Sequence, residues 1–206
     1  MKLTTRELVT VAVFGTLWGI VEISLGTVLK SLNVPLSGAV LAAIGLTVAL
    51  VGRLFVPRRG ATLFIGIIAM MLKLFSLGGV VIGPMVGIFS EALVAELILS
   101  LGGKPRRSLF VLAGALGVLW TLVQPLVTGP LLFGRALFVV WLDLLDSASR
   151  LLGLNNSTLS WLVLLLVAIY LFIGGLAGWF SWDIGRHLLV RLDKSPDATF
   201  EQELNV

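Results

Sequence analysis

Six apolar runs divide this chain, and their lengths constrain its fold more than any other feature. The first five are close to the roughly 20 helical residues that cross a lipid bilayer, and the last is longer. Apolar residues make up 58% of the chain and charged residues 13%, against about 45–50% and ~25% in soluble domains. The sequence therefore predicts an all-α membrane protein with a six-helix transmembrane domain over residues 1–190 and a polar cytoplasmic tail over 191–206. The predicted spans are Glu7–Leu29, Leu36–Val56, Ala61–Leu77, Val80–Leu101, Leu109–Val127 and Leu159–Leu189.

A further helical pattern lies between the fifth and sixth runs. Apolar residues recur at helical spacing over Phe133–Leu152, and charged residues fall largely between them. Such a pattern is typical of an amphipathic helix lying on the membrane surface. We expect a surface helix here, with an apolar re-entrant segment as the alternative.

The distribution of lysine and arginine predicts the orientation. A cytoplasmic N-terminus places eleven of these residues inside and four outside, which agrees with the positive-inside rule. Six spans then leave both termini cytoplasmic in a multi-pass protein of the cell (plasma) membrane, embedded in its lipid bilayer. The inside group comprises Lys2, Arg6, Arg53, Arg58, Arg59, Lys104, Arg106, Arg107, Arg186, Arg191 and Lys194, and the outside group Lys30, Lys73, Arg135 and Arg150.

Several functions are disfavoured by what the sequence lacks. It has no cysteine, and its one histidine is His187, so no metal site of thiolates or clustered histidines is expected. The net charge of +4 reflects membrane topology rather than binding to nucleic acid. No nucleotide-binding loop of the Gly-x-x-x-x-Gly-Lys-Ser/Thr type is present, so ATP hydrolysis must come from partners. We expect no cofactor and no enzymatic activity.

Four spans each carry a polar side chain near the centre or outer half of the membrane. These residues are Glu22, Lys73, Glu91 and Gln124, and at 1.5 Å per helical residue each lies roughly 16–22 Å from the end of its span. Polar groups at such depth are costly and are commonly functional. Glu96 lies about 8 Å deeper than Glu91 and is rotated by about 140° around the helix, so we expect it to be structural and paired with an arginine of the segment Lys104–Arg107.

Small residues and indoles accompany these polar groups. Trp18 stands one turn from Glu22, Trp120 one turn from Gln124, and Gly87 shares a face with Glu91. Apolar walls with a few polar groups are typical of a small-molecule site. We predict an outward-opening substrate pocket formed by Glu22, Lys73, Glu91, Gln124, Trp18 and Trp120. The alternative is that Lys73 only neutralises a glutamate while the glycines pack helices.

The layout resembles a known family of membrane proteins. The stretches "ELVTVAVFGTLWGIVE" in the first span and "LGGVVIGPMVGIFSEALVAEL" leading into the fourth are similar to the substrate-binding S components of energy-coupling factor transporters. The resemblance implies a subunit that binds a vitamin or related micronutrient from outside and docks on a transmembrane coupling subunit driven by two cytoplasmic ATPases. In the family the docking face of the first span carries Ala-x-x-x-Ala. The corresponding residues here are Ala12, Gly15, Thr16 and Gly19, whose small-x-x-x-small spacing allows close helix approach.

Two features bear on the ligand in opposite ways. Acids beside indoles favour a thiamine-like or hydroxymethylpyrimidine-like ligand through charge and cation–π contact, whereas Lys73 suits a carboxylate. A stand-alone ion-coupled transporter or channel that uses Glu22, Lys73 and Glu91 is the alternative function.

Overall fold

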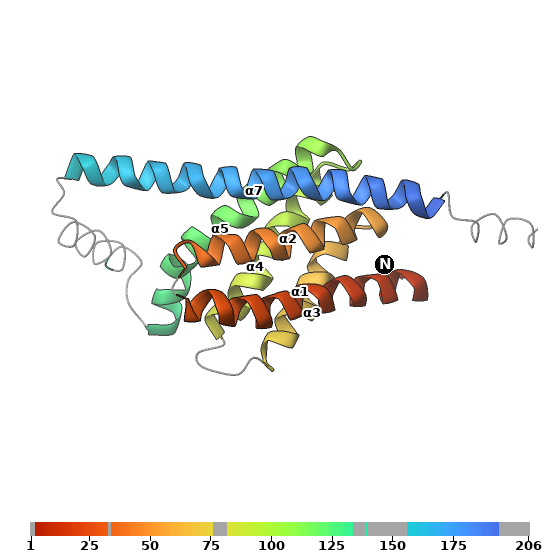
Figure 1. Cartoon of the computed structure of the whole chain (residues 1–206), viewed down its shortest axis with the longest axis horizontal. Coiled ribbons are helices and arrows are strands. Elements are labelled where there is room, and N and C mark those ends of the chain that lie inside the picture. The colour runs from red at the N-terminus through yellow and green to blue at the C-terminus, as the bar shows by residue number, and fades with distance from the viewer. Residues whose placement is uncertain (1–2, 33, 76–81, 134–138, 140–155, 194–206) are drawn as a thin grey trace, which may run out of the picture.

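The computed structural model describes residues 3–32, 34–75, 82–133, 139 and 156–193. Every regular element within them is a helix, which confirms the all-α architecture. The helices are α1 (Thr5–Ser31), α2 (Ser37–Phe55), α3 (Ala61–Lys73), α4 (Ile82–Leu101), α5 (Arg107–Phe133) and α7 (Asn156–Asp193). They form a bundle whose described first and last residues lie at the same end (Figure 1).

Five of these helices are long and apolar enough to cross a membrane. The chain is therefore a multi-pass membrane protein. The third predicted span is shorter than expected, since α3 ends at Lys73 after 13 residues and about 20 Å. A sixth crossing thus stays a prediction. The surface helix predicted over Phe133–Leu152 lies almost wholly outside the described residues.

The longest helix, α7, has 38 residues, or about 57 Å. It continues three residues past the predicted domain boundary at 190, and the rest of the predicted tail lies outside the described residues. The helix packs along α5, where the backbones come together at Gly114, Gly174 and Gly178. Gly174 and Gly178 are four residues apart and so lie on one face of α7. Because glycine has no side chain, the two helix backbones can approach closely there.

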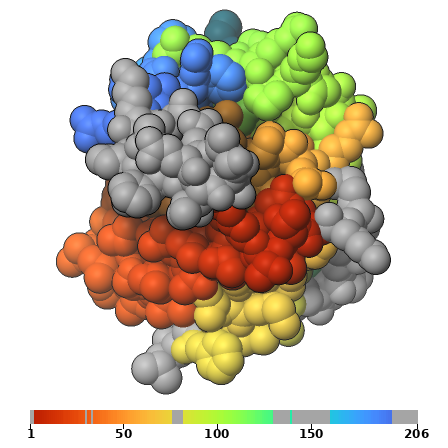
Figure 2. Space-filling view, turned by 90° about the vertical axis from the view of Figure 1, so that its right-hand side faces the viewer, coloured from red at the N-terminus to blue at the C-terminus, as the bar shows by residue number. Residues whose placement is uncertain are grey.

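The start of α1 is fixed by local hydrogen bonds. The Thr4 backbone N–H donates to Oε2 of Glu7 at 2.8 Å, and the Glu7 N–H donates to Oγ1 of Thr4 at 3.3 Å. This reciprocal pair is a capping box, which satisfies two N–H groups that a helix start leaves without partners. Glu7 also forms an ion pair with Arg58 in the α2–α3 loop. Figure 2 views this end of the bundle, with the start of α1 in red and the end of α7 in blue beside green residues of the α4–α5 region.

Candidate functional site

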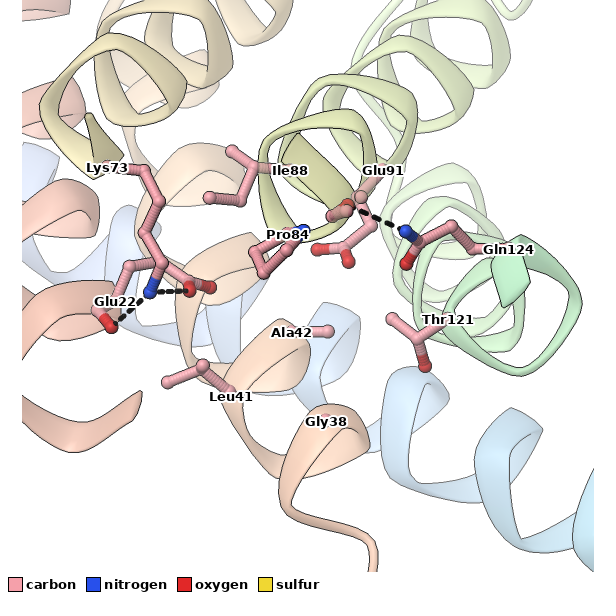
Figure 3. A pocket seen from close by; sticks show the side chains of 12 residues that line it. Glu22, Gly38, Leu41, Ala42, Lys73, Pro84, Ile88, Glu91, Thr121 and Gln124 are labelled. Carbon is pink, nitrogen blue, oxygen red and sulfur yellow. Dashed lines mark hydrogen bonds and ion pairs between the residues drawn. The ribbon is translucent and has the colours of Figure 1, made fainter. Parts of the chain in front are cut away.

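A cavity of about 280 Å³ lies among five helices, at the level where α3 ends. Polar side chains from α1, α3, α4 and α5 face it, and apolar residues of α2 and α4 complete its wall (Figure 3). The described lining residues are Glu22, Gly38, Leu41, Ala42, Lys73, Gly83, Pro84, Gly87, Ile88, Glu91, Thr121 and Gln124. The structure therefore brings together four of the six residues that the sequence assigned to a pocket, namely Glu22, Lys73, Glu91 and Gln124.

One side of the cavity is a buried ion pair between α1 and α3. The Lys73 ammonium lies 3.4 Å from Oε2 of Glu22 and donates a hydrogen bond of 2.7 Å to the Glu22 backbone carbonyl. The two residues are only 6% and 4% exposed. Lys73 therefore neutralises Glu22 in this structure, which is the alternative that the sequence left open for it.

Glu91 occupies the opposite side of the cavity. It is 5% exposed, and its Oε2 accepts no hydrogen bond from the residues that the structure describes. Figure 3 shows its carboxylate directed toward the middle of the lining residues. A buried carboxylate oxygen without a hydrogen bond is unfavourable, because it has lost water and gained no other donor. Glu91 is thus poised to accept hydrogen bonds from a group that enters the cavity.

Gln124 connects α5 to the first turn of α4. Its Nε2 donates to the Gly83 carbonyl at 2.7 Å. The missing side chain of Gly87 makes room for it, since a Cβ there would lie 2.9 Å from Oε1 of Gln124. The amide is therefore held in place beside Glu91.

The sequence missed the wall that α2 contributes. Gly38, Leu41 and Ala42 line the cavity, yet α2 has no charged or amide side chain before Arg53 that would have indicated a role in a site. On α5 Thr121 lines the cavity together with Gln124, whereas the neighbouring Trp120 does not. That these residues line the cavity is evident only from how the helices pack together.

Both tryptophans assigned to the pocket lie elsewhere, which corrects that expectation. Neither is among the described residues that line the cavity. Trp18 is fully buried in the apolar core, where its indole lies against Gly45 of α2 and Gly66 of α3. These glycines leave the volume that the ring fills, so the indole packs helices together and does not cover a ligand.

The four residues predicted to dock a partner divide between two faces of α1. Gly15 and Gly19 are buried against α3, where a Cβ would lie 2.7 Å from Ile68 Cβ and 2.6 Å from Leu72 Cδ1, respectively. Ala12 and Thr16 are exposed. The expectation that all four share one available face is therefore corrected. The glycines pack α3, and only Ala12 and Thr16 are accessible to a partner.

Glu96 lies outside the cavity and joins three helices. Its carboxylate accepts hydrogen bonds from the backbone N–H groups of Gly60 at 2.7 Å and Thr62 at 3.0 Å, at the start of α3. It also lies 3.5 Å from Nη2 of Arg53 on α2 and accepts a bond from Ser100 on its own helix. The expected structural role agrees with these contacts, but the arginine comes from α2 and not from Lys104–Arg107.

Replacing Glu96 by glutamine is expected to lower the free energy of unfolding by about 1–3 kcal/mol, the range for weakening hydrogen bonds to a buried charged group. The amide leaves Arg53 without its counter-ion and keeps only one acceptor oxygen for the start of α3. Denaturation of the purified protein in mixed micelles measures the change. Glu7→Gln, which weakens the more accessible ion pair with Arg58, is the control, and equal destabilisation by both variants would contradict this role for Glu96.

The described residues contain no group of three or more acidic or histidine side chains that could hold a metal ion. No family model, curated protein sequence or solved structure matches the chain. The class of protein defined by fold and site is therefore a multi-pass helical membrane protein with a small cavity among its helices, lined by apolar walls and a few polar groups.

Proposed function

We propose that this chain is a membrane-embedded substrate-binding subunit for uptake of a vitamin or related micronutrient, similar to the S components of energy-coupling factor transporters. The cavity carries the proposal, because about 280 Å³ lined by apolar walls and a few polar groups suits a small metabolite. Glu91 is its principal ligand-binding group, with Gln124 and Thr121 beside it. Partner ATPases supply the energy for uptake, and a transmembrane coupling subunit supplies the path across the membrane. This subunit docks on the exposed face of α1 that carries Ala12 and Thr16.

Transport assays test this proposal directly. The chain, purified from cells in nutrient-rich medium, should carry a small molecule that mass spectrometry of the denatured sample identifies. Uptake of that molecule into cells should require both this chain and ATP-driven partners. Uptake by proteoliposomes that hold this chain alone would instead support the second function below.

The second candidate function is that of a stand-alone ion-coupled transporter or channel. It is favoured by one observation, that three ionisable side chains, Glu22, Lys73 and Glu91, line a single cavity within the membrane-spanning region. An ion path would give a current or proton flux across liposomes containing the purified chain alone. A binding subunit would give none.

The proposed topology places both termini and the α2–α3 and α4–α5 loops in the cytoplasm. We expect a cysteine at Lys104, in the α4–α5 loop, to be protected from an impermeant maleimide in intact cells and labelled after permeabilisation. A cysteine at Leu32, between α1 and α2, should react in intact cells. Both positions are exposed. Labelling of Lys104→Cys from outside would overturn this orientation.

A further inference from the structure

We infer that the cavity selects ligands that carry a cationic or N–H donor group, such as an amine, an amidine or an amino-heterocycle, and that it rejects carboxylates. This inference rests on the proposed function and specifies the substrate class of the same site. It follows from which polar groups of the cavity are already engaged and which are not.

The charges of the lining residues bear on the ligand class. Among the described residues that line the cavity, Glu22 and Glu91 are acidic and Lys73 is basic. Lys73 lies against Glu22, 3.4 Å from its carboxylate and 2.7 Å from its backbone carbonyl. Because Lys73 pairs with Glu22, any uncompensated negative charge of the lining is that of Glu91 in its ionised form. A cationic ligand would balance this charge in a low-dielectric environment, where ion pairs interact strongly.

The hydrogen-bonding groups of the described lining differ in whether they are already engaged. Oε2 of Glu91 accepts no hydrogen bond from any described residue. An ionised carboxylate can only accept hydrogen bonds. Lys73, the strongest donor in the lining, already donates to Glu22. Thr121 and Gln124 likewise donate to the backbone carbonyls of Val118 and Gly83. The described donors of the lining are thus engaged with protein acceptors, and a donor on the ligand is the partner that Glu91 Oε2 lacks.

The rest of the cavity wall is largely apolar. Leu41, Ala42 and Ile88 face the cavity with apolar atoms, and Gly38 presents no side chain. They suit a flat apolar body attached to the donor group. An anionic ligand would meet Glu91 directly and would have to displace Glu22 from Lys73 before it could form an ion pair.

Three probes of nearly equal shape and different charge test the inference. Benzamidine is cationic, benzamide neutral and benzoate anionic. We expect the full chain in lipid nanodiscs to bind benzamidine most tightly and benzoate least tightly in isothermal titrations. Glu91→Gln should weaken benzamidine binding by about ten- to a hundredfold, the loss of one hydrogen bond to a charged group, and should leave benzamide within a few-fold. Glu96→Gln, a buried carboxylate on the same helix but outside the cavity, should retain the wild-type order of affinities.

The other outcomes are equally defined. Tightest binding of benzoate would assign the ligand-binding charge to Lys73 and overturn the inference. A benzamidine preference that survives Glu91→Gln, or no binding of any probe, would overturn it as well. The proposed transport function fails separately: a charge preference without nutrient uptake leaves the ligand class intact, whereas ATP-dependent uptake of a carboxylate overturns the ligand class and leaves the transport function intact.

Discussion

Replacing Lys73 by methionine is expected to lower the free energy of unfolding by about 3–5 kcal/mol, the usual cost of removing one member of a buried ion pair. The ammonium is 3.4 Å from the Glu22 carboxylate, and both residues are nearly inaccessible. Methionine has a similar length and keeps the apolar contacts of the lysine stem. The decrease in the free energy of unfolding therefore reflects the lost charge of Lys73. Denaturation in mixed micelles, followed by circular dichroism, measures it.

A second substitution separates this explanation from simple misfitting at position 73. Glu22→Gln in the Lys73→Met background removes the remaining charge, so the double variant should recover most of the stability. Lys104→Met, at an exposed loop position, should change little. If the double variant is as unstable as Lys73→Met alone, the ion pair is not the source of the stability, and Lys73 becomes available as a ligand-binding group.

Most of the helices could be predicted from the sequence because apolar length dominates the behaviour of a chain in a bilayer. The end of α3 was not predictable, since the apolar run continues to Leu77 while the helix ends at Lys73. The end coincides with the point where Lys73 reaches the Glu22 carbonyl on another helix. Hydropathy contains no information about such a contact.

The polar residues of the cavity could be found because buried charges are rare in an apolar sequence, and each therefore stands out. Its apolar wall could not, since Leu41 and Ala42 are typical of any spanning helix. Trp18 was misassigned because the glycines that receive its indole, Gly45 and Gly66, belong to two other helices. Glu96 was expected to pair with an arginine close in sequence, but packing of α2 against α4 supplies Arg53 instead.

A substitution at the contact between α5 and α7 is also expected to destabilise the protein strongly. At Gly178 an added Cβ would lie 2.6 Å from the backbone carbon of Phe110 and 2.8 Å from Val111 Cα. Backbone atoms of a packed helix cannot move aside as a flexible side chain can. Gly178→Ala should therefore force α5 and α7 apart and lower the free energy of unfolding by about 1–3 kcal/mol, the usual cost of overpacking.

Gly175 provides a matched control within the same helical turn. A Cβ there meets its nearest neighbour, Val111 Cγ1, at 3.8 Å, which is ordinary contact. Because alanine is favoured over glycine in a helix interior by about 1 kcal/mol, Gly175→Ala should be neutral or stabilising. Parallel denaturation of the two variants compares one chemical change, a single methyl group, at adjacent faces of α7. If the two variants had the same free energy of unfolding, the glycines of α7 would not be in close contact with α5. The helix would then be free to shift along the bundle that encloses the cavity.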